Sequence, residues 1–152
     1  MVNEKILGTY QTWLDNVKEA DLAAELQAMK GDEGKIEDAF YRELEFGTGG
    51  LRGVLGAGTN RMNVYTVARA AQGLADYVVK HFPAEARSIA ISYDSRIKSD
   101  AFAQVSADVF AANGIKAHIY PQLMPTPLLS YAVRALGCAA GVMVTASHNP
   151  SK

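Results

Sequence analysis

The residues best suited to chemistry lie close to the carboxyl end of the chain, directly after an apolar run. Ala139 to Val144 is followed at once by Thr145-Ala146-Ser147-His148-Asn149-Pro150. A buried parallel strand that ends in this way presents the next side chains at the sheet edge where α/β folds bind their ligands. A serine in such a loop is a candidate nucleophile or phosphate carrier. Taken alone, the segment fits equally well a loop whose serine caps the next helix.

Serine-hydrolase chemistry is the first hypothesis to test for this loop, and the sequence disfavours it. No Gly-x-Ser-x-Gly elbow surrounds Ser147, and His148 is its chain neighbour, from where an imidazole does not readily reach back to the hydroxyl. His81 and His118 are expected on a helix end and within a strand. Phosphoryl carriage fits better, because a serine that accepts a phosphate needs alignment and positive charge more than a dedicated base.

A glycine-rich segment, Phe46-Gly47-Thr48-Gly49-Gly50-Leu51-Arg52-Gly53, is a second candidate for phosphate binding. Glycines allow successive backbone amides to turn toward an anion, and Thr48 and Arg52 add a hydroxyl and a guanidinium. The segment is not a Walker loop, since no Gly-Lys-Ser/Thr follows, and no clear strand precedes it as a dinucleotide fingerprint requires. The alternative is a tight glycine turn with a solvated arginine, and the spacing favours neither.

Two further polar segments fall where loops are expected. In Tyr93-Asp94-Ser95-Arg96, the aspartate and Arg96 could pair with each other or cap the next helix, and the sequence alone favours that over a direct role. Pro125-Thr126-Pro127 has the chemistry of a rigid loop and a helix start.

Alternating helix and strand patterns must position these segments. They predict a helix after the N-cap Asn63, a strand at 89–91, a helix over 100–112, a strand at 115–119, a helix from Thr126 and a strand at 139–144. Such an order implies right-handed crossovers and strand ends that open on one edge. We therefore expect a three-layer α/β fold, with a mostly parallel mixed sheet covered by helices. Residues 1–45 carry apolar side chains at helical spacing and form an N-terminal helical extension, and residues 46–152 form the α/β domain.

Composition narrows the class of protein. The chain has 152 residues, 49% of them hydrophobic, with 15 Lys and Arg against 16 Asp and Glu. That balance argues against nucleic-acid or anionic-membrane partners, which require a basic excess. Cys138 is the only cysteine, so no intrachain disulfide can form. No secretory signal and no membrane span is visible, and a cytoplasmic location is expected.

In this order, the glycine-rich segment, Tyr-Asp-Ser-Arg, Pro-Thr-Pro and Thr-Ala-Ser-His-Asn-Pro resemble first-domain signatures of the α-D-phosphohexomutase superfamily. The resemblance runs from about Phe46 to the final residue. The helical lead-in and the stretch from Gly53 to Asn63 are most similar to the phosphoglucomutase/phosphopentomutase branch.

The resemblance implies roles for individual residues. Ser147 would carry the phosphoryl group, pass it to a sugar monophosphate and take back the other phosphate of a bisphosphate intermediate, and His148 would assist proton transfer. Thr48 and Arg52 would approach the phosphate, Asn149 would line the serine loop and Arg96 would lie near the cleft. Mg²⁺ would be bound by Ser147 only through its phosphate, together with an aspartate-rich loop of the second domain.

The resemblance also implies that much of the enzyme is absent from this chain. Complete members have four domains, so the later domains would be the partners of residues 46–152, with a sugar phosphate as substrate. We expect the chain alone to be inactive, and glucose 1-phosphate and glucose 6-phosphate to be the substrates of the parent enzyme. Two alternatives stay open: phosphomannomutase or phosphopentomutase specificity, and a non-catalytic module that binds phosphate or sugar phosphate.

Overall fold

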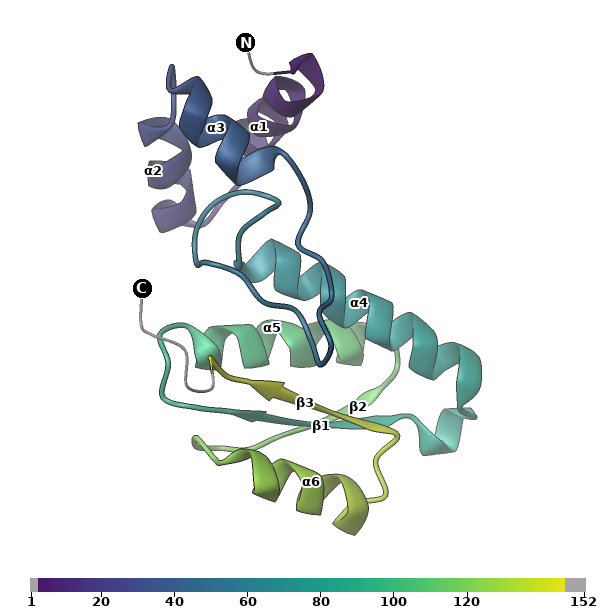
Figure 1. The fold of residues 1–152 in the computed structure, drawn as a ribbon. Coiled ribbons are helices and arrows are strands. Elements are labelled where there is room, and N and C mark those ends of the chain that lie inside the picture. The colour runs from purple at the N-terminus through teal and green to yellow at the C-terminus, as the bar shows by residue number, and fades with distance from the viewer. Residues whose placement is uncertain (1–2, 147–152) are drawn as a thin grey trace. The chain divides into compact units, whose positions relative to one another are not determined.

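The computed structural model describes residues 3–146 of the chain, which divides into two compact units, residues 1–66 and residues 67–152. Helices α1 to α3 and a long loop make up the first unit. The second holds a three-stranded sheet with helices on its faces (Figure 1).

The first unit begins with the helices α1 (Glu4–Asn16), α2 (Ala20–Ala28) and α3 (Glu33–Phe40). The side chain of Asn3 caps α1 and that of Asp32 caps α3, each accepting a hydrogen bond from a backbone amide of the first turn. Their apolar faces share one core: Tyr10, Leu22, Leu26, Ile36, Ala39, Phe40 and Ala57. The expected N-terminal helices are confirmed.

A loop follows α3, and Asn63 fastens its far end. The buried Asn63 amide donates to the carbonyl oxygens of Gly56 (2.8 Å) and Gly58 (3.0 Å). Its oxygen accepts from the amides of Tyr65 and Thr66 at the start of the next helix, as expected of an N-cap. Gly58 has φ +129°, and a Cβ there would lie 2.4 Å from the Ala39 carbonyl oxygen, so only glycine fits at this close approach.

The second unit contains three parallel strands, β1 (Ser88–Tyr93), β2 (Lys116–Ile119) and β3 (Ala140–Val144), in the order β2-β1-β3. The helices α4 (Val64–His81), α5 (Ser99–Ala112) and α6 (Thr126–Ala135) precede or connect them, with a short 3₁₀ turn, η1 (Ala84–Ala86), before β1. The predicted α/β fold is confirmed; a mostly parallel mixed sheet was expected, and all three described strands are parallel.

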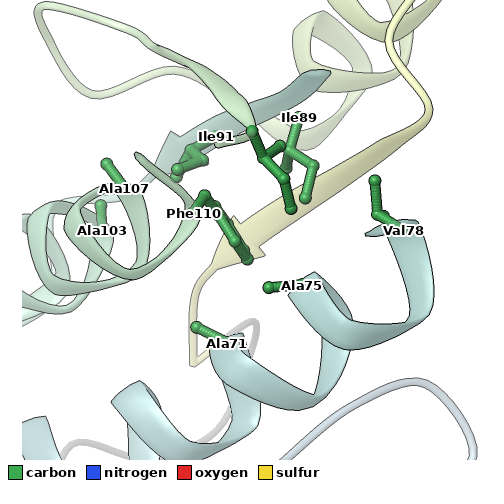
Figure 2. Packing of buried hydrophobic residues seen from close by; sticks show 9 residues of the cluster. Ala71, Ala75, Val78, Ile89, Ile91, Ala103, Ala107 and Phe110 are labelled. Carbon is green, nitrogen blue, oxygen red and sulfur yellow. The ribbon is translucent and has the colours of Figure 1, made fainter. Parts of the chain in front are cut away.

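Alternate residues of β1 face opposite layers of helices. Ile89 and Ile91 pack on one side with α4 and α5, where the fully buried Phe110 lies among them (Figure 2). Ala90 faces the other side and packs against α6 through Leu129 and Ala132. Burial on both faces explains why the central residues of β1 form an apolar run.

Helix α4 is amphipathic, with Val67, Ala71, Ala75 and Val78 as its buried stripe. None of the helices within residues 3–146 is both long enough and apolar enough to cross a membrane.

Candidate functional site

The carboxyl ends of β1 and β3 meet at one edge of the sheet. Tyr93 is paired in register with Val144, and the Asp94 amide donates to the Val144 carbonyl oxygen at 3.1 Å, one residue beyond the strand. Asp94 and Thr145 are therefore neighbours, although 51 positions separate them in the chain. Parallel pairing thus brings the loop after β1 to the segment that precedes Ser147.

The Asp94 carboxylate joins three segments at this edge. One oxygen, Oδ1, accepts hydrogen bonds from the Arg96 amide (3.0 Å) and the Ser99 hydroxyl (2.9 Å). The other, Oδ2, accepts from the Thr145 hydroxyl at 2.6 Å. The carboxylate thus ties the β1–α5 loop, the start of α5 and the end of β3 to one point.

The ionised form of Asp94 is favoured by these donors. Burial by itself raises the pKa of the carboxyl, but hydrogen bonds from the Thr145 hydroxyl, the Arg96 amide, the Ser99 hydroxyl and the Ala146 amide outweigh it. The pKa of Asp94 is therefore held below its ordinary value of 3.8. The carboxylate is charged at neutral pH, and its oxygens already accept hydrogen bonds from donors within the protein.

Arg96, the candidate phosphate-binding residue of this loop, lies half-buried next to the carboxylate. The Arg96 backbone amide donates a hydrogen bond to Asp94, and this bond restricts the position of the Arg96 Cα atom. Two residues later, Lys98 has φ 64°, the only non-glycine residue with positive φ within residues 3–146. This turn brings the chain sharply into α5, and the half-buried Arg96 remains on the edge where β1 and β3 end.

The loop between β2 and α6 is fastened to the same edge. The fully buried Ser92 hydroxyl donates to the Met124 carbonyl oxygen (2.9 Å), and the Met124 amide donates to the Tyr93 carbonyl oxygen (3.0 Å). The Pro125-Thr126-Pro127 segment that follows therefore starts beside the end of β1. Helix α6 begins at Thr126, as the sequence predicts, and Pro125 occupies its N-cap position.

The glycine-rich segment belongs to the first unit and forms a tight turn. Phe46 and Leu51 make an antiparallel bridge, and the Gly47 amide donates to the Gly50 carbonyl oxygen at 2.9 Å. Thr48 and Arg52 are exposed on this turn. Because the turn itself uses the Gly47 amide, an anion bound here would meet the remaining amides and the two side chains.

Ser147, His148 and Asn149 lie outside the described residues, so their expected roles stay predictions. Among residues 3–146, no three His, Cys, Asp or Glu side chains gather into a group that could hold a metal ion. The described residues therefore assign Mg²⁺ no ligand. His81 stacks on Tyr77 with ring centroids 4.1 Å apart, and His118 lies in β2, which agrees with packing or surface roles for both.

Sequence reasoning missed the bond between Asp94 and Thr145. It weighed Asp94 against Arg96 and the next helix only, because those groups are close in sequence. Ser99, a hydroxyl at the first residue of α5, was the available local signal for a second contact. The contact with Thr145 depends on the order of the strands in the sheet, and a single sequence does not give that order.

Comparison with known proteins identifies a family to which the chain is similar. Residues 43–152 match the family model "Phosphoglucomutase/phosphomannomutase, alpha/beta/alpha domain I". A probable phosphoribomutase of Schizosaccharomyces pombe is 44% identical over 121 residues, which are 79% of this chain and 21% of that protein. A phosphoglucomutase of Staphylococcus saprophyticus is 41% identical over 138 residues, which are 91% of this chain and 24% of that protein.

A phosphopentomutase of Mus musculus is 36% identical over 129 residues, covering 80% of this chain and 21% of that protein. The chain thus spans between about a fifth and a quarter of the length of these relatives. No solved structure matches it.

Proposed function

Because the chain belongs to the phosphoglucomutase/phosphomannomutase family through its alpha/beta/alpha domain I, we propose that it is the serine-bearing domain of a phosphosugar mutase. The observation that carries this proposal is the family match over residues 43–152, which includes the Thr-Ala-Ser-His-Asn-Pro segment. Support comes from the fold, because the segment follows a parallel strand that ends beside β1.

In the proposed reaction, Ser147 holds a phosphoryl group and gives it to the free hydroxyl of a sugar monophosphate. A bond forms between phosphorus and the sugar oxygen, the bond from phosphorus to Ser147 Oγ breaks, and the sugar hydroxyl's proton ends on the serine oxygen. The bisphosphate then returns its other phosphoryl group to Ser147. The net result exchanges phosphate between C1 and C6 of the sugar.

The proposed residues contribute alignment and positive charge. Arg52 and Arg96 carry guanidinium groups that suit the oxygens of a phosphoryl group, and Thr48 adds a hydroxyl. His148 is proposed to move the proton at Ser147 Oγ, and Asn149 to line the same loop. Family membership implies Mg²⁺ in the complete enzyme, where it would neutralise charge on the phosphoryl oxygens; this chain is proposed to reach the metal only through the Ser147 phosphate.

We propose glucose 1-phosphate and glucose 6-phosphate as the substrate pair. The relative from Staphylococcus saprophyticus, which covers 91% of this chain, bears the name phosphoglucomutase. A pentose phosphate is the second candidate, because relatives named phosphoribomutase and phosphopentomutase match the chain at 44% and 36% identity.

The test uses the complete protein that contains this chain, supplied with glucose 1-phosphate, glucose 1,6-bisphosphate and Mg²⁺. We expect glucose 6-phosphate to form, one phosphate to be added to Ser147 by intact mass, and Ser147→Ala to lower kcat by about 10⁴-fold or more. Ribose 1-phosphate in place of glucose 1-phosphate tests the pentose alternative.

Reversible binding of sugar phosphate without any mass change or turnover would replace the mutase by a non-catalytic binding module. Full activity in Ser147→Ala would move the phosphate carrier elsewhere.

A further inference from the structure

We propose that Asp94 is a positioning residue that fixes Thr145 and Ala146, the two residues immediately before Ser147, through its carboxylate at the end of β1. This inference rests on the proposed function, in which Ser147 carries the phosphoryl group. It assigns Asp94 no contact with substrate, metal or the reacting atoms.

The contacts of Asp94 support a structural clamp at the site. Arg96 and Ser99 donate to Oδ1 from the loop after β1 and from the first residue of α5. Thr145 donates to Oδ2 at 2.6 Å, and the Ala146 amide is a further donor to the carboxylate. The Asp94 carboxylate therefore binds both the first residue of α5 and the residues that follow β3.

The number of donors also argues against a catalytic role for Asp94. An ionised carboxylate has about four lone-pair sites on its two oxygens. Four protein donors, from Arg96, Ser99, Thr145 and Ala146, already occupy this capacity. A general base or a metal ligand needs an acceptor site open to its partner, so the carboxylate is suited to holding the backbone.

The position of the residues before Ser147 matters for the proposed phosphoryl transfer. The transfer depends chiefly on alignment of the attacking oxygen with phosphorus, and a displacement of about 1 Å can slow an enzyme by roughly 100-fold. Asp94 is joined to the segment before Ser147 by hydrogen bonds at two consecutive residues, Thr145 and Ala146. Loss of these bonds is expected to change the rate of transfer more than the affinity for the sugar.

The first test replaces the exposed Thr145 in the complete protein. Thr145→Val keeps the branched shape and removes the hydroxyl, and Thr145→Ser keeps the hydroxyl. The probe is glucose 1,6-bisphosphate, and the readout is the single-turnover rate at which Ser147 gains phosphate: the phosphorus–sugar oxygen bond breaks, a bond to Ser147 Oγ forms and the serine proton passes to the sugar oxygen. We expect Thr145→Val to slow this rate by about 10- to 100-fold with KM within about 3-fold of wild type, and Thr145→Ser to recover most of it.

The second test asks whether Asp94 acts through Thr145. Asp94→Asn keeps the Oδ1 acceptor but replaces Oδ2 by a donor, so the Thr145 hydroxyl loses the oxygen to which it donates. In a double-mutant cycle, Asp94→Asn is expected to slow phosphorylation less in the Thr145→Val background than in wild type. Hydrogen exchange of the backbone amides at residues 139–146, measured in the complete protein, gives a readout independent of activity. Asp94→Asn is expected to speed this exchange.

Ser106→Ala is the matched control for loosening of the same unit. The Ser106 hydroxyl is buried and donates to the Phe102 carbonyl oxygen within α5, away from the edge where β1 ends. Ser106→Ala removes a buried side-chain hydrogen bond from the same unit and should leave the phosphorylation rate unchanged.

The outcomes separate the two proposals. A phosphorylated wild-type protein whose rate is unaffected by Thr145→Val and Asp94→Asn overturns the positioning role alone. The same holds if Ser106→Ala slows phosphorylation as much as they do, because general loosening would then explain the effect. A wild-type protein that never gains phosphate overturns the proposed function, and the positioning role with it.

Discussion

The Asp94 carboxylate is surrounded by donors from the backbone and from two hydroxyl groups, and these donors stabilise its charged form. Its folded-state pKa is consequently lower than its value in the unfolded chain. In such a case, the unfolded state binds more protons as the pH falls, so the contribution to stability is present above the unfolded pKa and is lost as the pH falls through the folded pKa.

This linkage gives a prediction for Asp94→Asn. Its melting temperature should fall below that of wild type above about pH 4, by an amount that corresponds to about 1 kcal/mol, the net worth of a hydrogen bond near the surface. The difference should shrink as the pH is lowered past the folded-state pKa of Asp94, since wild type then loses the same charge. Thermal unfolding of both proteins from pH 3 to 7 measures it.

Asp108→Asn controls for the removal of one carboxylate, because Asp108 is exposed on α5 and bonds only locally to Gln104. A difference between wild type and Asp94→Asn that stays constant from pH 3 to 7 would show that the bonds to Asp94 do not depend on its charge.

At the scale of elements, the Asn63 side chain makes two sets of hydrogen bonds where the long loop of the first unit ends and α4 begins. Its Oδ1 atom caps the helix by accepting from the amides of Tyr65 and Thr66. Its Nδ2 atom donates to the carbonyl oxygens of Gly56 and Gly58 and so holds the loop closed. Aspartate is as good an N-cap as asparagine, but it has no donor for the loop.

Asn63→Asp is therefore expected to be destabilising despite the good cap. At neutral pH it would place a buried carboxylate against two carbonyl oxygens, which costs about 2–3 kcal/mol of the free energy of unfolding. Burial beside carbonyl oxygens would raise the pKa of this carboxyl, so at pH 4 it carries a proton and one donor and part of the loss should be recovered. Denaturant unfolding at pH 7 and pH 4 measures both effects.

The comparison variant is Asp32→Asn at the start of α3, where the side chain is exposed and caps the Lys35 amide without closing a loop. It should change stability far less than Asn63→Asp. Equal effects of the two substitutions would mean that Asn63 serves only as a cap.

At the scale of the whole molecule, the chain covers between about a fifth and a quarter of its mutase relatives. Within residues 3–146, no group of metal-ligating side chains forms. A site of this reaction needs the serine, positive charge and groups that bind the sugar at once. Under the proposed function, groups beyond residues 3–146 are needed to complete it.

We therefore expect the isolated 152-residue chain to produce no glucose 6-phosphate from glucose 1-phosphate with glucose 1,6-bisphosphate and Mg²⁺. The complete protein, assayed in parallel under the same conditions, is the positive control. Product formation by the isolated chain that disappears in Ser147→Ala would contradict this expectation.

The sequence was sufficient for the order and type of the elements. Apolar runs at 89–91 and 139–144 predict β1 and β3, and alternating apolar residues at 115–119 predict β2. The expected α4 and its cap at Asn63 are also confirmed. The helical extension was equally accessible, because its apolar residues recur at helical spacing. These features depend on contacts within a few residues, which periodicity and capping chemistry describe.

The sequence by itself also determined the family, since four short segments in order carry the resemblance that the match over residues 43–152 confirms. Only the tertiary structure decided that Asp94 meets Thr145 and that Asn63 closes the loop onto Gly56 and Gly58. Asp94 and Thr145 are brought together by the parallel pairing of β1 with β3, which places the two strand ends side by side. Strand order follows from the burial of both sheet faces by the helices around them, a property of the assembled unit that no local stretch of residues contains.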